Sequence, residues 1–445
     1  ALGKGALDAN TTASYNTAAG VNALGANTTG ASNTAFGNQA LLANTTASNN
    51  TAVGTSALVA NTTGVNNTAL GANSLDACTT GNNNTALGIN ALTASTTGSQ
   101  NTGVGRAVLQ STTTAAGNTA IGESALQANT TGANNVAVGA NALDANTTAS
   151  SSVAVGSGAL GANTVGSYSV AIGFSALAAQ NPASAGASFN TAVGTEAGTA
   201  VTTGTNNTFV GGLAGDATDD GANNTAVGKG ALSANCGDNN TAFGVNTGSG
   251  VTSSGNTLIG TGAGNDTTVL TNGSNNSLMG AYLKTDSAGS DYAMGLGYNL
   301  VCAGGYTTLG NGSSDIRAAH GNVTWATVSD ERYKKDIVDS TAGLSFINAL
   351  QPRTFKYKTL GELPETFNAY EADSTEVFKN SDTNHGFIAQ EVKAAIDADS
   401  SIKDGFRLWD DREDGSQEVA EAALIPVLVK AIQEQNALIE ALTTR

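Results

Sequence analysis

Residues 50–66 read "NTAVGTSALVANTTGVN", and the fold follows from the repetition of this unit along the chain. After an insertion, "AAQNPASAGAS" at 178–188, the unit resumes at Asn190 and continues to Asn276. Before the insertion its first position recurs in nine successive steps of 17 residues, at Asn16, Asn33, Asn50, Asn67, Asn84, Asn101, Asn118, Asn135, Ser152 and Ser169. Self-similarity of this regularity predicts a solenoid rather than a globular core.

Each unit contains the pieces of one solenoid winding. The segment "TAVG" predicts a short strand with alternating faces, closed by a glycine that permits a tight turn. We expect "SALVA", with Leu58, to form a second strand, and "NTTG" to turn through side-chain bonds to the backbone. Three or four small apolar residues per coil make a thin core, so we expect three chains to pack side by side through their Ala and Gly faces.

The Asn-Thr-Thr turns admit two interpretations. The triplet fits the acceptor pattern for N-glycosylation, and it also suits a turn in which Asn and Thr side chains bond nearby backbone groups. The second interpretation is favoured. It begins at Asn10, Asn27, Asn44, Asn61, Asn129 and Asn146.

Composition excludes several classes of function. The 445 residues carry 18 Lys and Arg against 35 Asp and Glu, a net charge of -17, which disfavours binding to nucleic acid or to an anionic membrane. No apolar run is long enough to cross a bilayer, so we expect no membrane insertion. Three cysteines without CxxC spacing and two histidines give no metal site, and no cofactor motif is present.

A different domain begins at Ser329. The stretch "SDERYKKDI" at 329–337 carries six charges in nine residues, whereas the repeats before it are almost uncharged. We therefore divide the chain into a mainly β solenoid shaft at 1–310, a connector at 311–328 and a small α/β domain at 329–445. The expectation for the whole is a trimeric parallel β-solenoid of about 17 residues per coil, followed by this domain.

The small domain is expected to end in a long helix over about 418–442. Apolar residues at the 3,4 spacing of a heptad predict a trimerisation seam with one polar layer. The seam consists of Ile425, Leu428, Ile432, Gln435, Ile439 and Leu442. Three heptads are few, and an amphipathic helix that packs on its own domain remains an alternative.

The repeats resemble the heads of trimeric autotransporter adhesins and the repeat shafts of phage tail fibres. The resemblance rests on short motifs such as "NTAVG" and "SVAIG" and covers residues 1 to about 310. It implies a left-handed parallel β-roll that packs as a homotrimer.

The final domain resembles the C-terminal intramolecular chaperone of phage endosialidases, tail spikes and tail fibres. Four motifs occur in the family's order: "SDERYKKDI", "INALQPRTFKYK", "HGFIAQEV" and "LIPVLVKAIQEQNALIEAL". The resemblance implies a domain that trimerises, helps the preceding β-structure assemble and then releases itself with a Ser–Lys dyad. Carried over by position, Ser329 is the nucleophile, Lys334 the base, Asp330 an orienting carboxylate, and Val328–Ser329 the bond that is cut.

These resemblances lead to one expectation for function. The chain would be a structural fibre protein of a virion tail, involved in attachment to a host cell-surface receptor or glycan, with a single self-cleavage in cis as its only enzyme activity. The chain begins inside a repeat, so we expect further sequence before it, through which other virion tail proteins would be bound. The alternative is an extracellular bacterial adhesin or filament subunit that retains its C-terminal trimerisation cap.

Overall fold

The computed structural model describes residues 1–265, 269–322, 326, 329, 331–399, 402, 408–411 and 415–444. The chain forms two compact units, Ala1–Val328 and Ser329–Arg445. Each unit is described by itself below.

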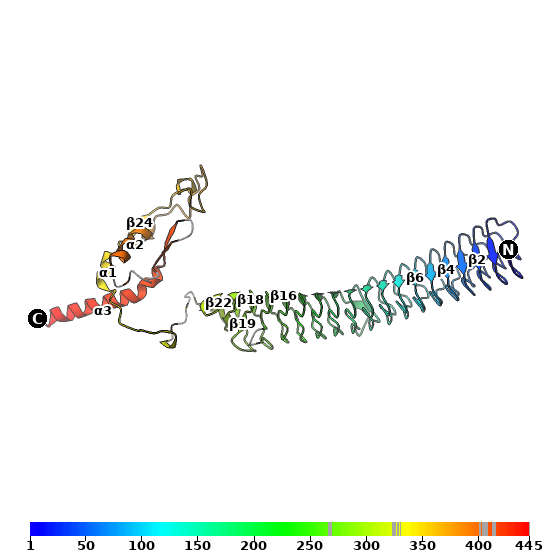
Figure 1. Ribbon diagram of the computed structural model, residues 1–445, viewed down its shortest axis with the longest axis horizontal. Helices are drawn as coiled ribbons and strands as arrows, with labels where there is room; N and C mark the ends of the chain where they lie inside the picture. Colours follow the sequence, from blue (N-terminus) through cyan, green and yellow to red (C-terminus); the bar gives the residue numbers. More distant parts are fainter. Residues whose placement is uncertain are drawn as a thin grey trace. The chain divides into compact units, whose positions relative to one another are not determined.

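The first unit is a parallel β-solenoid, as the repeat predicts. Its main sheet has 19 strands, all of which run parallel except β23 (Ser314–Ala319), and successive strands lie side by side (Figure 1). Equivalent residues pair in register, so that Thr34 of one coil lies opposite Thr51 of the next, 17 residues on. The parallel strands are β1 (Thr17–Ala19), β2 (Thr34–Phe36), β3 (Thr51–Val53), β4 (Thr68–Leu70), β5 (Thr85–Leu87), β6 (Thr102–Val104), β7 (Thr119–Ile121), β8 (Val136–Val138), β9 (Val153–Val155), β11 (Val170–Ile172), β13 (Thr191–Val193), β14 (Thr208–Val210), β15 (Thr225–Val227), β16 (Thr241–Phe243), β17 (Thr257–Ile259), β18 (Ser277–Met279), β20 (Met294–Tyr298) and β22 (Tyr306–Asn311).

A regular coil contains one strand, so the expectation of two strands per winding is wrong. The "SALVA" segment is a turn, in which Leu58 has φ 52° and its equivalents have similar values. Positive φ is unfavourable for a branched side chain such as Leu. Here it places the Leu58 side chain fully inside the coil, while the Leu58 N–H donates to the carbonyl of Ser74 in the next coil at 3.0 Å. Burial and this hydrogen bond offset the backbone strain.

The core of most coils is filled by alanine and leucine. In the coil of β3 the strand residue Ala52 and the turn residues Ala57 and Leu58 are all fully buried. The expectation that the Ala faces pack between chains is therefore wrong, since the strand alanines point into the chain's own core. Their small side chains leave room for the leucine of the same coil.

A buried ladder of asparagines links neighbouring coils. The Asn50 side chain donates to the carbonyl of Gly64 at 2.9 Å and accepts the N–H of Asn67 from the next coil at 2.9 Å. A second ladder uses the Asn of the NTT turns, where Asn61 donates to Asn44 and to Gly64. The Asn44 and Asn61 side chains are fully buried and their amide nitrogens donate within the fold, which supports the turn interpretation over glycosylation.

The glycine after each strand is required by the packing of coils. Gly54 has φ 139°, and a Cβ at this position would lie 2.5 Å from the carbonyl oxygen of Gly71 in the next coil. Any other residue would push neighbouring coils apart, because this contact is with rigid backbone.

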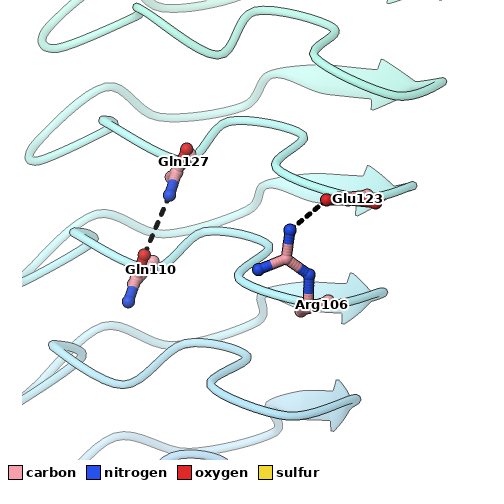
Figure 2. Close-up of polar contacts among 4 residues, drawn as sticks. All are labelled: Arg106, Gln110, Glu123 and Gln127. Atoms are coloured by element: carbon pink, nitrogen blue, oxygen red, sulfur yellow. Dashed lines mark hydrogen bonds and ion pairs between the residues drawn. The ribbon is translucent and has the colours of Figure 1, made fainter.

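Some coils carry side-chain contacts on their outer surface that other coils lack. Arg106 forms an ion pair with Glu123, and Gln127 donates to Gln110 at 3.0 Å, both across the same pair of coils (Figure 2). The Arg106 and Glu123 side chains are more than half exposed. Exposed pairs of this kind stabilise weakly, by about 0–1 kcal/mol.

An apolar stripe runs along the outside of the sheet, and we call it the outer stripe. It is formed by the third residue of the three-residue strands and by the residues aligned with it in β20 and β22. Several members are well exposed, among them Phe36 at 45%, Ile121 at 42% and Phe243 at 57%. The stripe consists of Ala19, Phe36, Val53, Leu70, Leu87, Val104, Ile121, Val138, Val155, Ile172, Val193, Val210, Val227, Phe243, Ile259, Met279, Leu296 and Leu309. An exposed apolar strip that spans the sheet is unusual for a solitary chain.

The parallel stack ends in an antiparallel hairpin. β22 pairs along its whole length with β23, and Arg317 of β23 also bridges to Ala326. The segment expected as a connector therefore starts with a strand of the same sheet.

Two short side ladders interrupt the regular coils. One pairs β10 (Gly166–Ser167) with β12 (Gly186–Ala187) at the insertion, and the other pairs β19 (Lys284–Thr285) with β21 (Val301–Cys302).

The second unit is a small α/β domain with a terminal helix. Its elements are η1 (Glu331–Tyr333), α1 (Leu344–Ala349), β24 (Arg353–Phe355), η2 (Leu360–Glu362), β25 (Asn384–Gly386), α2 (Ala389–Ala398), β26 (Trp409–Asp411), β27 (Gln417–Val419), η3 (Glu421–Ala423) and α3 (Leu424–Thr443). The expected start of the last helix near residue 418 is wrong, because β27 and η3 precede it. A core around Phe346, Val392 and Leu408 joins α1, α2 and the start of α3. Across the described residues, no helix is long and apolar enough to cross a membrane.

Candidate functional site

The predicted serine and lysine meet at the first residue of the second unit. The Lys334 ammonium donates a hydrogen bond to the Ser329 hydroxyl, with 2.8 Å between Nζ and Oγ. The intervening 3-10 turn η1 makes this possible, because the chain folds back on itself and the Lys334 N–H donates to the carbonyl of Glu331 at 2.9 Å. A spacing of five residues thus becomes direct side-chain contact.

Both side chains are exposed in the single chain. The hydrogen bond joins Lys334 Nζ to Ser329 Oγ, the two atoms between which a proton would pass in the reaction. General-base catalysis requires a neutral amine that accepts the hydroxyl proton, and lysines in this role are normally desolvated. Ser329 and Lys334 therefore make the contact that the reaction requires, but in the single chain their side chains are not buried.

Two other residues of the predicted site lie outside the described residues. These are Asp330, expected to orient the dyad, and Val328, which precedes the expected cleavage point. Within the described part of the chain, no group of three His, Cys, Asp or Glu side chains is placed to hold a metal ion.

Helix α3 carries two apolar faces. Leu424, Val427 and Ala431 are buried against the domain, and this face joins the core around Phe346. The predicted seam lies on other positions and is open to solvent, with Ile425 61%, Leu428 41%, Ile432 56%, Ile439 52% and Leu442 71% exposed. In Figure 1 the C-terminal half of α3 extends away from α1 and α2. The two interpretations of the helix thus apply to two different faces of it.

A groove of about 810 Å³ lies elsewhere in the domain, and the sequence gives no sign of it. Aromatic residues from separate segments form much of its wall, among them Phe355, Tyr357, Phe367 and Phe378. The Lys379 ammonium lies 5.3 Å from the centre of the Tyr357 ring, within the range of a cation–π contact. Only the folding of β24, β25 and β27 brings these residues together.

The domain that holds the Ser–Lys contact is similar to a known family. Residues 329–399 match the family model of the chaperone of endosialidase. The match begins at Ser329 and ends before α3, so it includes the dyad and α2 but not the helical seam. Searches of curated proteins and of solved structures find no match to the chain. A β-solenoid joined to a domain that is similar to this family fits an endosialidase-type tail fibre.

Proposed function

We propose that the chain is the shaft and assembly domain of a phage tail fibre that takes part in host attachment. The domain at 329–445 brings three chains together, sets their register and then releases itself at Val328–Ser329. The observation that carries the proposal is the 2.8 Å contact between Lys334 and Ser329 at the start of a domain that matches the endosialidase chaperone family.

The cleavage chemistry uses Ser329 twice, as the nucleophile and as the residue that supplies the leaving nitrogen. Its Oγ attacks the Val328 carbonyl carbon through a five-membered ring, while Lys334 accepts the hydroxyl proton. As the C–N bond breaks, Lys334 returns the proton to the Ser329 nitrogen, which leaves an ester between Val328 and the Ser329 oxygen. Water then hydrolyses the ester, and the products are a Val328 carboxylate and a free Ser329 amine.

Exposure of the dyad supports a link between cutting and assembly. A lysine in water is protonated and cannot accept the serine proton. Contacts with neighbouring chains around Ser329 and Lys334 would desolvate the ammonium and favour its neutral form. Cleavage would then follow trimer formation, so that the domain leaves only after the shaft is aligned.

Two exposed apolar surfaces support a trimer. The seam on α3 has the 3,4 spacing of a coiled coil, and Ile432 and Ile439 in it are 56% and 52% exposed. The outer stripe offers a second surface along the shaft. Chains packed through both surfaces would bury side chains that the single chain leaves in water.

The intact mass of freshly expressed protein under denaturing conditions tests the cleavage. Wild type should give two pieces that part at Val328–Ser329, whereas Ser329→Ala and Lys334→Ala should stay whole. Lys335→Ala is the matched control and should be cut, since it removes a neighbouring charge and leaves the dyad. Hydroxylamine should speed cleavage and leave a hydroxamate on Val328, because it attacks an ester far faster than an amide. An uncut wild type in stable trimers would overturn the proposed chemistry.

Sedimentation of the full chain, kept whole by Ser329→Ala, tests the trimer. This uncut chain should sediment as three chains, and Ile432→Lys added to it should weaken assembly because three charges would meet in one layer. Lys430→Ala is the control, since Lys430 lies on the same helix and outside the seam. A monomeric uncut chain at micromolar concentration would overturn the assembly role.

A further inference from the structure

The rows of the outer stripe differ mainly in size. Val, Leu and Ile fill most of them, and the two aromatic rows are Phe36 in β2 and Phe243 in β16. In the outer stripe Phe36 lies between Ala19 and Val53. Alanine is the smallest residue type in the stripe, and valine is the next smallest. Phe36 and Phe243 are 45% and 57% exposed, so the single chain does not use them as core.

The symmetry of a trimer makes these sizes matter. If three chains pack in register around an axis along the shaft, each row contains three copies of one residue. A slip by one coil would place Val138 opposite Val155, which changes nothing in that row. The same slip would place Phe36 opposite Ala19 or Val53, which leaves a void in one row and an excess of volume in the other.

The backbone offers little help against such slips. Successive coils pair strand to strand with the same register, and the buried asparagine ladder repeats from coil to coil. Neighbouring valines such as Val193, Val210 and Val227 present equal side chains over consecutive rows. Over a run of equal rows such as this one, the stripe therefore offers little to distinguish the correct alignment of three chains from an alignment shifted by one coil.

We propose that Phe36 and Phe243 are register marks, which fix the alignment between three copies of this chain through the outer stripe. The inference rests on the proposed trimer and goes beyond it. Phe36 lies in the second row of the stripe and Phe243 in the fourteenth of its eighteen rows, so a slipped trimer is mismatched at two well-separated rows. The shaft thereby keeps its register by itself after the assembly domain has left.

Cross-linking measures the register directly. Two differently tagged full chains are co-expressed, one with Val138→Cys and the other with Val155→Cys. The native cysteines Cys78, Cys236 and Cys302 are buried and do not compete. In-register trimers favour disulfides between identical positions, whereas a one-coil slip favours the disulfide between positions 138 and 155. The trimers are heated until the chains of the shaft can change their alignment, and they are then cooled and oxidised. The ratio of the two disulfide products is measured afterwards.

The marks are removed by the double substitution Phe36→Val and Phe243→Val, which introduces the residue that many other rows already contain. We expect the fraction of slipped product to rise at least fivefold over wild type after annealing. Phe174→Val is the matched control, because Phe174 is 54% exposed and lies off the stripe. It should leave the ratio at the wild-type value.

A rescue experiment separates size from position. Val193→Phe, added to the double variant, creates a new mark in another row and should return the ratio to the wild-type value. Equal ratios in wild type, double variant and control would overturn the proposal, as would a failed rescue. A single-chain mass in sedimentation would instead refute the trimer itself. Trimers without disulfides between identical positions would refute the stripe as the interface.

Discussion

Substitution of one buried ladder residue, Asn84→Ala, should destabilise the shaft by an amount that the contacts define. Asn84 donates to the carbonyl of Gly98 at 2.8 Å and accepts the N–H of Asn101 at 3.0 Å. No other hydrogen bond in the described chain serves these two backbone groups, because the second ladder has Ser95 at this coil and its hydroxyl is unpartnered. The variant leaves two buried groups unsatisfied at about 1–3 kcal/mol each, or about 2–6 kcal/mol together.

The same substitution at Asn50 should cost about 1–3 kcal/mol less, because one buried group rather than two loses its partner. It removes equivalent bonds to Gly64 and from Asn67, yet the carbonyl of Gly64 still accepts from Asn61 at 3.0 Å. Only the N–H of Asn67 then loses its partner. Both sites are fully buried, and the second ladder supplies a remaining donor to the Gly64 carbonyl but none to the Gly98 carbonyl.

Urea unfolding of the full chain, followed by hydrogen exchange on fragments that cover each coil, measures both costs locally. This is needed because solenoids need not unfold in two states. Asn84→Ser is the control and should be intermediate, since Ser152 accepts the N–H of Ser169 at 3.4 Å in the same column. Equal losses for Asn50→Ala and Asn84→Ala, or a loss below about 1 kcal/mol for Asn84→Ala, would refute the role given to the ladders.

Three other predictions concern single side chains. Burial raises the pKa of Asp76 above 3.8, so the unfolded chain loses its proton at lower pH than the folded one, and stability falls as the pH rises through that window. The stability of Asp76→Asn against urea at pH 7 should therefore equal or exceed that of wild type, and the difference in stability should shrink towards pH 3.8. A variant less stable than wild type at pH 7 would contradict this. Burial raises the pKa of the Cys302 thiol to about 12. A thiol reagent at about pH 8 should therefore leave Cys302 unmodified until the chain unfolds. Rapid labelling of Cys302 in the folded chain would show that the core is open. Glu434 accepts the N–H of Leu344 at 2.8 Å, so Glu434→Ala should lower stability by about 1–3 kcal/mol in thermal unfolding of the second unit, whereas Glu434→Gln, which keeps an acceptor, should lose less.

The solenoid could be predicted because its signal is periodic. Seventeen-residue spacing gives the parallel stack and its register without knowledge of any contact. The conformation of the Leu turn could not be predicted, because residue preferences argue against positive φ for Leu58. Tertiary burial outweighs that local preference, and the same arrangement turns the alanines inward and the larger strand residues outward.

The second unit shows a similar limit. Motif order led to Ser329 and Lys334, and the structure places these side chains in contact, while their catalytic role stays a prediction. Heptad spacing identified the outward face of α3 but not the inward face at Leu424, Val427 and Ala431. A helix with apolar residues on two sides gives overlapping patterns, and only the packing of α1 and α2 shows which side is already covered.

The hairpin of β22 and β23 has a consequence for polymerisation. A parallel stack normally presents a bare row of backbone donors and acceptors at its end, onto which another chain can add as the next layer. β23 runs in the opposite direction and occupies that row on β22, so a further parallel coil finds no matching partner there. Addition of a further parallel coil to this end of the solenoid is thereby blocked.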